Sequence, residues 1–315
     1  MNDPAAFVRS AEERLKADVP GRTIVATSGG IDSTVAAALA ERALGERARA
    51  IFVDTGLLRA GEVERVSGYL GASGLKHEIV PASDRFFAAL AGVVDPEEKR
   101  RRIGAAFIRL FEAEASRFGT DRLVQGTIAP DWIESGGGLR DTIKTHHNVG
   151  GVPADSKLVL VEPLRDLYKD EVRALAHHLG VPEADRQPFP GPGLAVRVNG
   201  PVTVERVAQA RVANRVVEEE IERAVAAKEI PAPWQYFAVL LDARTVGVTG
   251  DNRVRGEAVS IRVVESIDAM TATAMALPRP VLRRMAERIT RELAGQVVRV
   301  LYDVTDKPPA TIEWE

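Results

Sequence analysis

A small-residue loop between an apolar run and an amphipathic helix constrains this chain more than any other feature. Residues 23–27 (Thr-Ile-Val-Ala-Thr) predict a buried strand, and Ser-Gly-Gly-Ile-Asp-Ser follows at 28–33. Val35, Leu39 and Ala43 then recur every four residues, which predicts a helix with one core-facing stripe. This order aims backbone N–H groups and the helix dipole at one point, which is an arrangement that binds phosphate.

The loop also limits which phosphate chemistry it can serve. It lacks the Gly-Lys-Ser/Thr ending of a Walker A motif, so no lysine is placed there to reach terminal phosphates. Asp32 stands there instead, and a carboxylate beside a nucleotide requires a bridging cation, which predicts Mg²⁺ held by oxygen ligands. The alternative is a Ser/Gly-rich turn that only caps a helix. The strand before it, the helix after it and the presence of Asp32 and Ser33 disfavour that alternative.

Composition excludes several functional classes. The chain has 315 residues, of which 45 % are hydrophobic and 28 % charged, as expected for a soluble enzyme of two domains. Its formal charge of −3 argues against a nucleic-acid binder with a basic surface. It has no cysteine, which excludes disulfides, zinc–thiolate sites, persulfide chemistry and a Cys nucleophile. We see no signal peptide and no membrane span, so a cytoplasmic location is expected.

Short β-branched runs alternate with helical patterns through the first 180 residues, which predicts an α/β fold with a parallel sheet covered on both faces. The predicted strands are 23–27, 50–53, 78–80, 123–125 and 158–161. The last helix of this half has an apolar stripe formed by Val172, Leu175, Ala176 and Leu179. Gly180 and Pro182 then end the helix.

Residues 186–201 mark a boundary, because residues 186–193 cannot form a helix and the four prolines from 182 to 192 exclude a central strand. Beyond them the patterns predict a smaller α+β unit, with helices near 203–228 and 279–293 and strands at 237–241, 259–264 and 297–301. We therefore expect two domains, residues 1–187 and residues 188–315.

Polar residues follow three of the predicted strands. The phosphate loop follows the first, Asp54-Thr55-Gly56 the second and Gln125-Gly126-Thr127 the fourth. Ligands of open α/β sheets bind at the carboxyl ends of the strands, so these residues are expected to converge on a nucleotide. Each set taken alone is also compatible with a plain turn.

The glycine-rich segment 131–151 predicts a mobile lid. Lys144 within it would offset negative charge on a reacting phosphate. His146 and His147 are adjacent and would point apart on a strand, which disfavours a zinc site. His177 and His178 fall in a last helical turn, where they complement the helix dipole.

Two basic features admit anionic ligands. The run Lys99–Arg102 is either a solvated helix face or a site for a substrate phosphate, and both interpretations stay open. Residues 302–315 contain Pro-Pro, Ile and Trp, which is unusual for a disordered tail. Lys307, with rigid prolines behind it, is expected to hold a small anionic ligand.

Several segments together resemble the synthetase part of GMP synthetases, a family of N-type ATP pyrophosphatases, and the resemblance runs from about residue 8 to residue 315. They are 28–33, 125–135, 144–151, 162–165, 189–197 and 307–315. The resemblance implies an adenine nucleotide alpha hydrolase-like parallel sheet with a smaller C-terminal α+β dimerisation domain. It also implies amination of xanthosine 5′-monophosphate (XMP): its O2 attacks the α-phosphate of ATP, pyrophosphate leaves, and ammonia displaces AMP to give GMP.

The resemblance further implies a role for each site residue. ATP would be bound by Ser28, Gly29, Gly30, Ile31, Asp32, Ser33, Asp54, Gly126 and Thr127, and XMP by Arg197, Lys307, Ile312 and Glu313. Asp32, as the Mg²⁺ ligand, and Lys144 of the lid would be catalytic. The implied cofactors are ATP and Mg²⁺. The implied partners are a second copy of the chain and, because cysteine is absent, a separate glutamine amidotransferase subunit as the ammonia source, with free ammonia as the alternative.

Competing interpretations are other ATP pyrophosphatases and a nucleotide sensor without turnover. An NAD synthetase would leave the C-terminal 125 residues unexplained, and tRNA-modifying adenylases usually need thiolate chemistry or a basic surface. A sensor predicts loss of Asp32 or Lys144, and both are present.

Overall fold

The computed structural model describes residues 3–72, 76–129, 156–181, 187–267 and 269–315, and the chain divides into two compact units. The first unit consists of Met1–Gly56, Gly61–Ala89 and Arg100–Gly191, and the second of Leu57–Ala60, Leu90–Lys99 and Pro192–Glu315. The chain therefore passes between the units five times, the last time between Gly191 and Pro192.

The first unit contains a five-stranded parallel sheet in the order β3-β2-β1-β4-β5. Its strands are β1 (Thr23–Thr27), β2 (Ala48–Asp54), β3 (His77–Pro81), β4 (Arg122–Val124) and β5 (Val159–Val161). The predicted fold class and strands are confirmed, with Gln125 and Leu158 just outside β4 and β5. Strand β1 lies between β2 and β4, so the chain reverses direction across the sheet at this strand, which is where such folds bind ligands.

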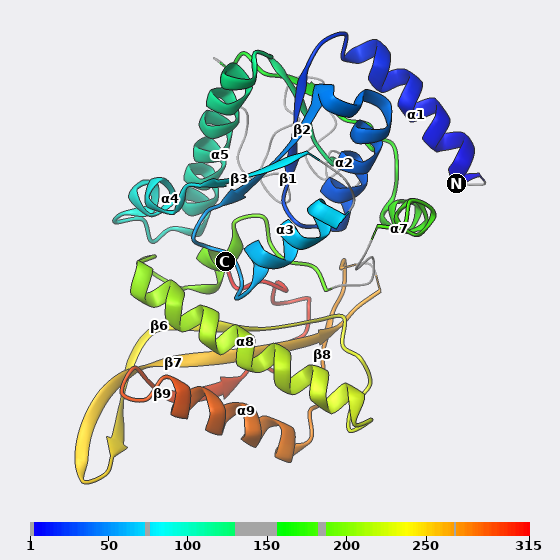
Figure 1. Cartoon of the computed structure of the whole chain (residues 1–315). Coiled ribbons are helices and arrows are strands. Elements are labelled where there is room, and N and C mark those ends of the chain that lie inside the picture. Colours follow the sequence, from blue (N-terminus) through cyan, green and yellow to red (C-terminus); the bar gives the residue numbers. More distant parts are fainter. Residues whose placement is uncertain (1–2, 73–75, 130–155, 182–186, 268) are drawn as a thin grey trace. The chain divides into compact units, whose positions relative to one another are not determined.

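Helices cover both faces of this sheet. They are α1 (Pro4–Asp18), α2 (Ile31–Leu44), α3 (Glu62–Ala72), α4 (Ser83–Leu90), α5 (Pro96–Phe118) and α7 (Lys169–His178), and a 3₁₀ turn, η1 (Gly45–Arg47), follows α2. Figure 1 shows α1, α2 and α7 on one side of the sheet and α4 and α5 on the other.

Helix α2 is buried more completely than its sequence pattern predicts. Val35, Leu39 and Ala43 are buried as expected, but so are Ala36 and Ala40 on the other faces. The reason is that α1 and α7 pack on α2 in addition to the sheet. Alanine at those positions lets the neighbouring helices approach closely. The buried surface of α2 is therefore wider than the single apolar stripe that the sequence predicts.

The second unit contains a mixed four-stranded sheet, as the α+β prediction requires. Strands β6 (Gln235–Thr249), β7 (Asn252–Glu265) and β8 (Thr273–Ala274) are antiparallel, and β9 (Val297–Tyr302) runs parallel to β7. Helices α8 (Val204–Ala226) and α9 (Arg279–Glu292) pack against each other and against β6 and β9 respectively (Figure 1). Strands β6 and β7 are longer than the apolar runs, since their outer halves pair as an exposed ribbon.

The segment that leads into α8 contains a buried 3₁₀ turn, η2 (Gly193–Arg197). Gly193 has a φ of +66°, and a Cβ there would lie 2.5 Å from the carbonyl oxygen of Leu57, so only glycine fits. Leu194 N–H donates to the same carbonyl at 2.7 Å.

None of the helices in the described ranges is long and apolar enough to cross a membrane.

Candidate active site

The loop between β1 and α2 is fixed by its own serines. The Ser33 Oγ lies 3.0 Å from the Ser28 Oγ and 3.0 Å from the carbonyl oxygen of Gly30, and it accepts the Ser28 N–H at 3.1 Å. Gly30 is the N-cap of α2 and has no side chain to satisfy the N–H groups of the first turn. These N–H groups and the helix dipole have the arrangement that favours an anion, and the anion site at residues 28–33 stays a prediction.

Two glycines allow neighbouring elements to approach this loop. Gly29 has a φ of +80°, and a Cβ there would lie 2.8 Å from Val66 Cγ2. Gly126, just after β4, packs against the first turn of α2: a Cβ there would lie 2.6 Å from the Asp32 carbonyl carbon and 2.6 Å from the Ser33 amide nitrogen. Because both atoms belong to the backbone, the clash cannot be relieved by a rotamer change.

Asp32 points toward a cation that sequence analysis missed. Lys169, the first residue of α7, donates from its Nζ to the Asp32 Oδ2 at 2.6 Å. The other carboxylate oxygen, Oδ1, is buried and has no hydrogen-bond partner. A buried carboxylate oxygen without a partner is costly, and a bound ion or water is one of the groups that can satisfy it.

The position of Lys169 in its helix is the one feature of the sequence that could have pointed to this ion pair. A lysine in the first turn of a helix opposes the positive end of the helix dipole. Lysine at this position, shortly after the last strand of a parallel sheet, is compensated here by the Asp32 carboxylate.

The residues around Asp32 fit a magnesium ion only if the nucleotide supplies most of the ligands. Within the described ranges no group of three or more His, Cys, Asp or Glu side chains stands close enough to hold a metal. Mg²⁺ is commonly bound by one or two carboxylates together with substrate phosphates and water. The Asp32 Oδ1, which has no hydrogen-bond partner, would provide one such ligand, and this metal role stays a prediction.

Strand order brings the three predicted polar strand ends to one edge, because β2, β1 and β4 are neighbours. After β2, Asp54 Oδ1 accepts the Gly56 N–H at 3.0 Å and fixes the turn. After β4, Gln125 Nε2 donates to Thr127 Oγ1 at 3.0 Å and to Glu162 Oε1 at 2.8 Å. These bonds hold the two strand ends in defined conformations beside the phosphate loop.

In the second unit, Arg197 and Glu313 are brought together although they are far apart in sequence. The Arg197 guanidinium donates to both carboxylate oxygens of Glu313, at 2.8 and 3.1 Å, and to Asn214 Oδ1 at 3.1 Å. It also stacks on the Phe237 ring, with 4.2 Å between its central carbon and the ring centroid. Arg197 is 1 % exposed, and its predicted role in XMP binding stays a prediction.

The other predicted XMP residues lie in the same segment as Glu313. Ile312 packs in a cluster with Phe237, and Lys307 Nζ donates to the Ala269 carbonyl at 2.8 Å. Lys144, His146 and His147 lie outside the described residues.

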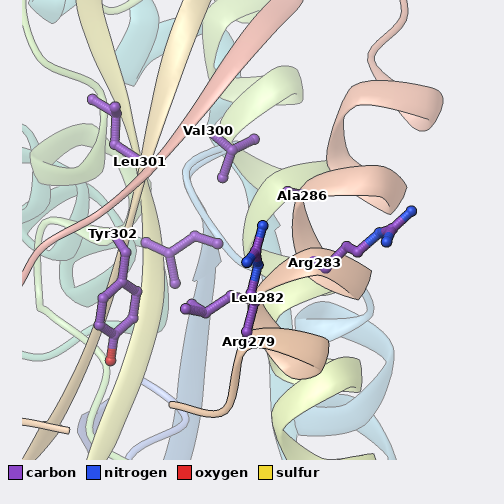
Figure 2. A pocket seen from close by; sticks show the side chains of 8 residues that line it. Arg279, Leu282, Arg283, Ala286, Val300, Leu301 and Tyr302 are labelled. Carbon is purple, nitrogen blue, oxygen red and sulfur yellow. The ribbon is translucent and has the colours of Figure 1, made fainter. Parts of the chain in front are cut away.

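A pocket of about 410 Å³ lies between α9 and β9 (Figure 2). It contains none of the predicted site residues. Its lining is apolar with two arginines, namely Ile261, Arg279, Leu282, Arg283, Ala286, Val300, Leu301 and Tyr302.

Comparison with known proteins gives relatives over nearly the whole chain. The family model described as "GMP synthase C terminal domain" matches residues 219–314. A Thermococcus kodakarensis protein, named as one subunit of a glutamine-hydrolyzing GMP synthase, is 58 % identical over 313 residues, covering 98 % of this chain and 99 % of that protein. Proteins of the same name from Methanopyrus kandleri and Thermoplasma acidophilum are 53 % and 51 % identical over 319 and 311 residues, covering 100 % and 99 % of both chains.

Among solved structures, the NMN synthetase from Francisella tularensis is similar in fold. The TM-score is 0.50 at 17 % identity, and the match covers 66 % of this chain and 85 % of that one. At this identity the similarity establishes the fold alone.

Proposed function

The chain belongs to the family of these glutamine-hydrolyzing GMP synthase subunits, and we infer from this that it is a ligase that aminates XMP to GMP at the expense of ATP. The observation that carries the proposal is the phosphate loop with Asp32 beside it, whose Oδ1 is buried and unpartnered. The comparisons give the reaction, and this loop is where we propose that ATP is cleaved.

We propose that the loop N–H groups and the α2 dipole bind the pyrophosphate portion of ATP, with the adenosine held at the ends of β2 and β4 by Asp54, Gly126 and Thr127. Mg²⁺, held by Asp32, would neutralise charge on the departing pyrophosphate. Asp32 would hold the metal through its unpartnered Oδ1 while Oδ2 keeps its bond to Lys169, and the remaining N–H groups of the Lys169 ammonium would donate to a phosphate oxygen. No side chain is needed as a nucleophile, because the oxygen of XMP attacks the phosphorus itself, and fixed positions of the two substrates supply much of the rate. Lys144 remains the proposed cation of the lid.

The Lys169 assignment predicts a selective loss of ATP affinity. Lys169→Met removes a charge-assisted bond to a phosphate, so the KM for ATP should rise about tenfold to 100-fold. The KM for XMP should stay near its original value. Steady-state pyrophosphate release measures both constants, and Lys16→Met, on the exposed side of α1, is the matched control. An unchanged KM for ATP would remove Lys169 from the nucleotide site.

For XMP we propose the segment that carries Lys307, Ile312 and Glu313. Lys307 supplies a positive charge, Ile312 an apolar contact and Glu313 a carboxylate that Arg197 holds in place. Arg197 itself is proposed to serve XMP through Glu313, given its burial.

Lys307→Ala should raise the KM for XMP about tenfold to 100-fold, because a charge-assisted bond to the nucleotide phosphate is lost. The KM for ATP should change by less than about twofold, which is the pattern expected of uniform binding to one substrate. Initial rates at varied XMP and varied ATP separate the two constants. Equal increases in both would show that Lys307 does not belong to the XMP site.

The name of these relatives implies a partner that hydrolyses glutamine, and we propose that it delivers ammonia. We also propose a homodimer through the second unit. Two exposed apolar side chains support this: Leu301 of β9 and Val304, two residues after β9, are 43 % and 75 % exposed.

The direct test supplies ATP, Mg²⁺, XMP and ammonium to the purified chain and measures pyrophosphate, AMP and GMP. All three should appear in equal amounts. Pyrophosphate formed only with nicotinic acid adenine dinucleotide would favour the NAD synthetase alternative, and nucleotide binding without turnover would favour a sensor.

A further inference from the structure

Three cationic side chains of the second unit are almost completely buried. Lys99, Arg197 and Arg262 have exposed fractions of 0–1 %. Each makes polar contacts with the segment 303–315, which carries the residues proposed to bind XMP. A buried charge is costly unless it is paired and hydrogen-bonded, so these contacts are strong constraints on where the segment lies.

The contacts of Lys99 are the least expected from sequence. Its Nζ donates to the Val198 carbonyl at 2.7 Å and to the Oε2 of Glu315. The second oxygen of Glu315, Oε1, accepts from Asn199 Nδ2 at 2.9 Å. The Glu315 side chain is 4 % exposed. We call this arrangement of Lys99 and Glu315 the buried clasp.

The clasp overturns both sequence interpretations of the basic run where Lys99 is concerned. A solvated helix face is wrong, because Lys99 is fully buried. An anion site is also wrong for this residue, because its side chain is fully buried and its ammonium group donates to two internal acceptors. Burial lowers the pKa of Lys99, and Glu315 opposes that shift by favouring the charged form.

Glu315 of the clasp lies two residues after Glu313, and other contacts fix the residues that precede it in the chain. Arg262 Nη2 donates to the Thr311 carbonyl at 3.0 Å, and Gln235 Nε2 donates to Glu313 Oε1 at 3.0 Å. Ile312 is 8 % exposed and packs in the core cluster. Residues 311–313 are thus held directly by Arg262 and Gln235, and the clasp holds the chain two residues further on, at Glu315.

We propose that Lys99 is a positioning residue for XMP: by binding Glu315 it fixes the segment whose Lys307, Ile312 and Glu313 contact the substrate. The inference rests on the proposed XMP site. It assigns to a residue at the start of α5 an effect on a substrate that it does not touch. A residue that merely stabilised the fold would have no such preference for one substrate.

The test uses the full chain and Lys99→Met, which keeps the length of the side chain and removes the ammonium group. The KM for XMP should rise at least about tenfold, while the KM for ATP and kcat at saturating XMP change by less than about threefold, because only ground-state binding of XMP is weakened. Calorimetric titration with XMP in the absence of ATP should show the same loss of affinity.

Two further variants keep the result interpretable if Lys99→Met folds poorly. Glu315→Gln preserves the size of the partner side chain and one acceptor oxygen, so its KM for XMP should rise less than in Lys99→Met but still selectively. Lys76→Met is the matched control, because Lys76 pairs with Glu46 where both side chains are more than half exposed. This control should leave every constant unchanged.

The possible outcomes separate the clasp from the proposed function. If the original chain fails to bind XMP, both fail together. If it binds XMP and folded Lys99→Met and Glu315→Gln bind XMP equally well, the XMP assignment stands and the positioning role is wrong. A uniform decrease in kcat with an unchanged KM for XMP would likewise overturn the inference.

Discussion

Asp32→Ala is expected to lower XMP-dependent pyrophosphate release by about 10²–10³-fold, the usual effect of removing one preorganised electrostatic group from a reacting centre. The melting temperature should not fall. Asp32 Oδ1 is buried without a partner, and the ion pair with Lys169 is partly exposed, so neither oxygen contributes much to the stability of the fold.

Asp32→Asn sharpens this test, because it keeps the size of the side chain and removes only its charge. If the carboxylate binds Mg²⁺, Asn should be nearly as inactive as Ala at low Mg²⁺ and recover partly as the Mg²⁺ concentration is raised. Near-normal turnover of either variant at all Mg²⁺ concentrations would refute the metal role. Thermal unfolding followed by circular dichroism checks that both variants are folded.

Gly126→Ala is expected to damage both the fold and the nucleotide site. The added Cβ would lie 2.6 Å from backbone atoms of Asp32 and Ser33, so β4 or the first turn of α2 has to move. Overpacking of this kind typically costs about 1–3 kcal/mol of folding free energy. A displacement of about 1 Å in the phosphate loop can lower the rate about 10²-fold.

Gly68→Ala is the matched control, since Gly68 is a glycine inside α3 and a Cβ there meets nothing within 4 Å. It should stabilise the protein by about 0.5–1 kcal/mol, because alanine favours the helix. Urea unfolding and pyrophosphate release should be measured for both variants. Equal stability and equal activity of Gly126→Ala would contradict the close packing of β4 on the loop.

The fold was largely predictable because its signals are local. Strand β1, the loop at 28–33 and the apolar stripe of α7 were each predicted from a pattern or motif that is contained within a short stretch of sequence. That the polar strand ends meet on one edge followed from the general behaviour of parallel sheets, and the observed order of β2, β1 and β4 agrees with it.

The partners of the charged residues were not predictable, because they are set by tertiary packing. Lys169 meets Asp32 across 137 residues, and Lys99 meets Glu315 across 216. Lys99 is a clear example: it begins a run of four basic residues that reads as a solvated surface, yet its side chain is fully buried. Nothing within a helical turn of Lys99 distinguishes it from Arg100.

The interrupted path of the chain restricts how the protein can be dissected or recombined. A fragment that starts at Pro192 would omit Leu57–Ala60 and Leu90–Lys99, so Glu315 would lose Lys99 and Glu218 would lose Arg59. The half that carries Lys307 and Glu313 therefore cannot be transplanted as one uninterrupted stretch of gene. A functional chimaera with a homologue would need residues that replace Lys99 and Arg59 as partners of Glu315 and Glu218.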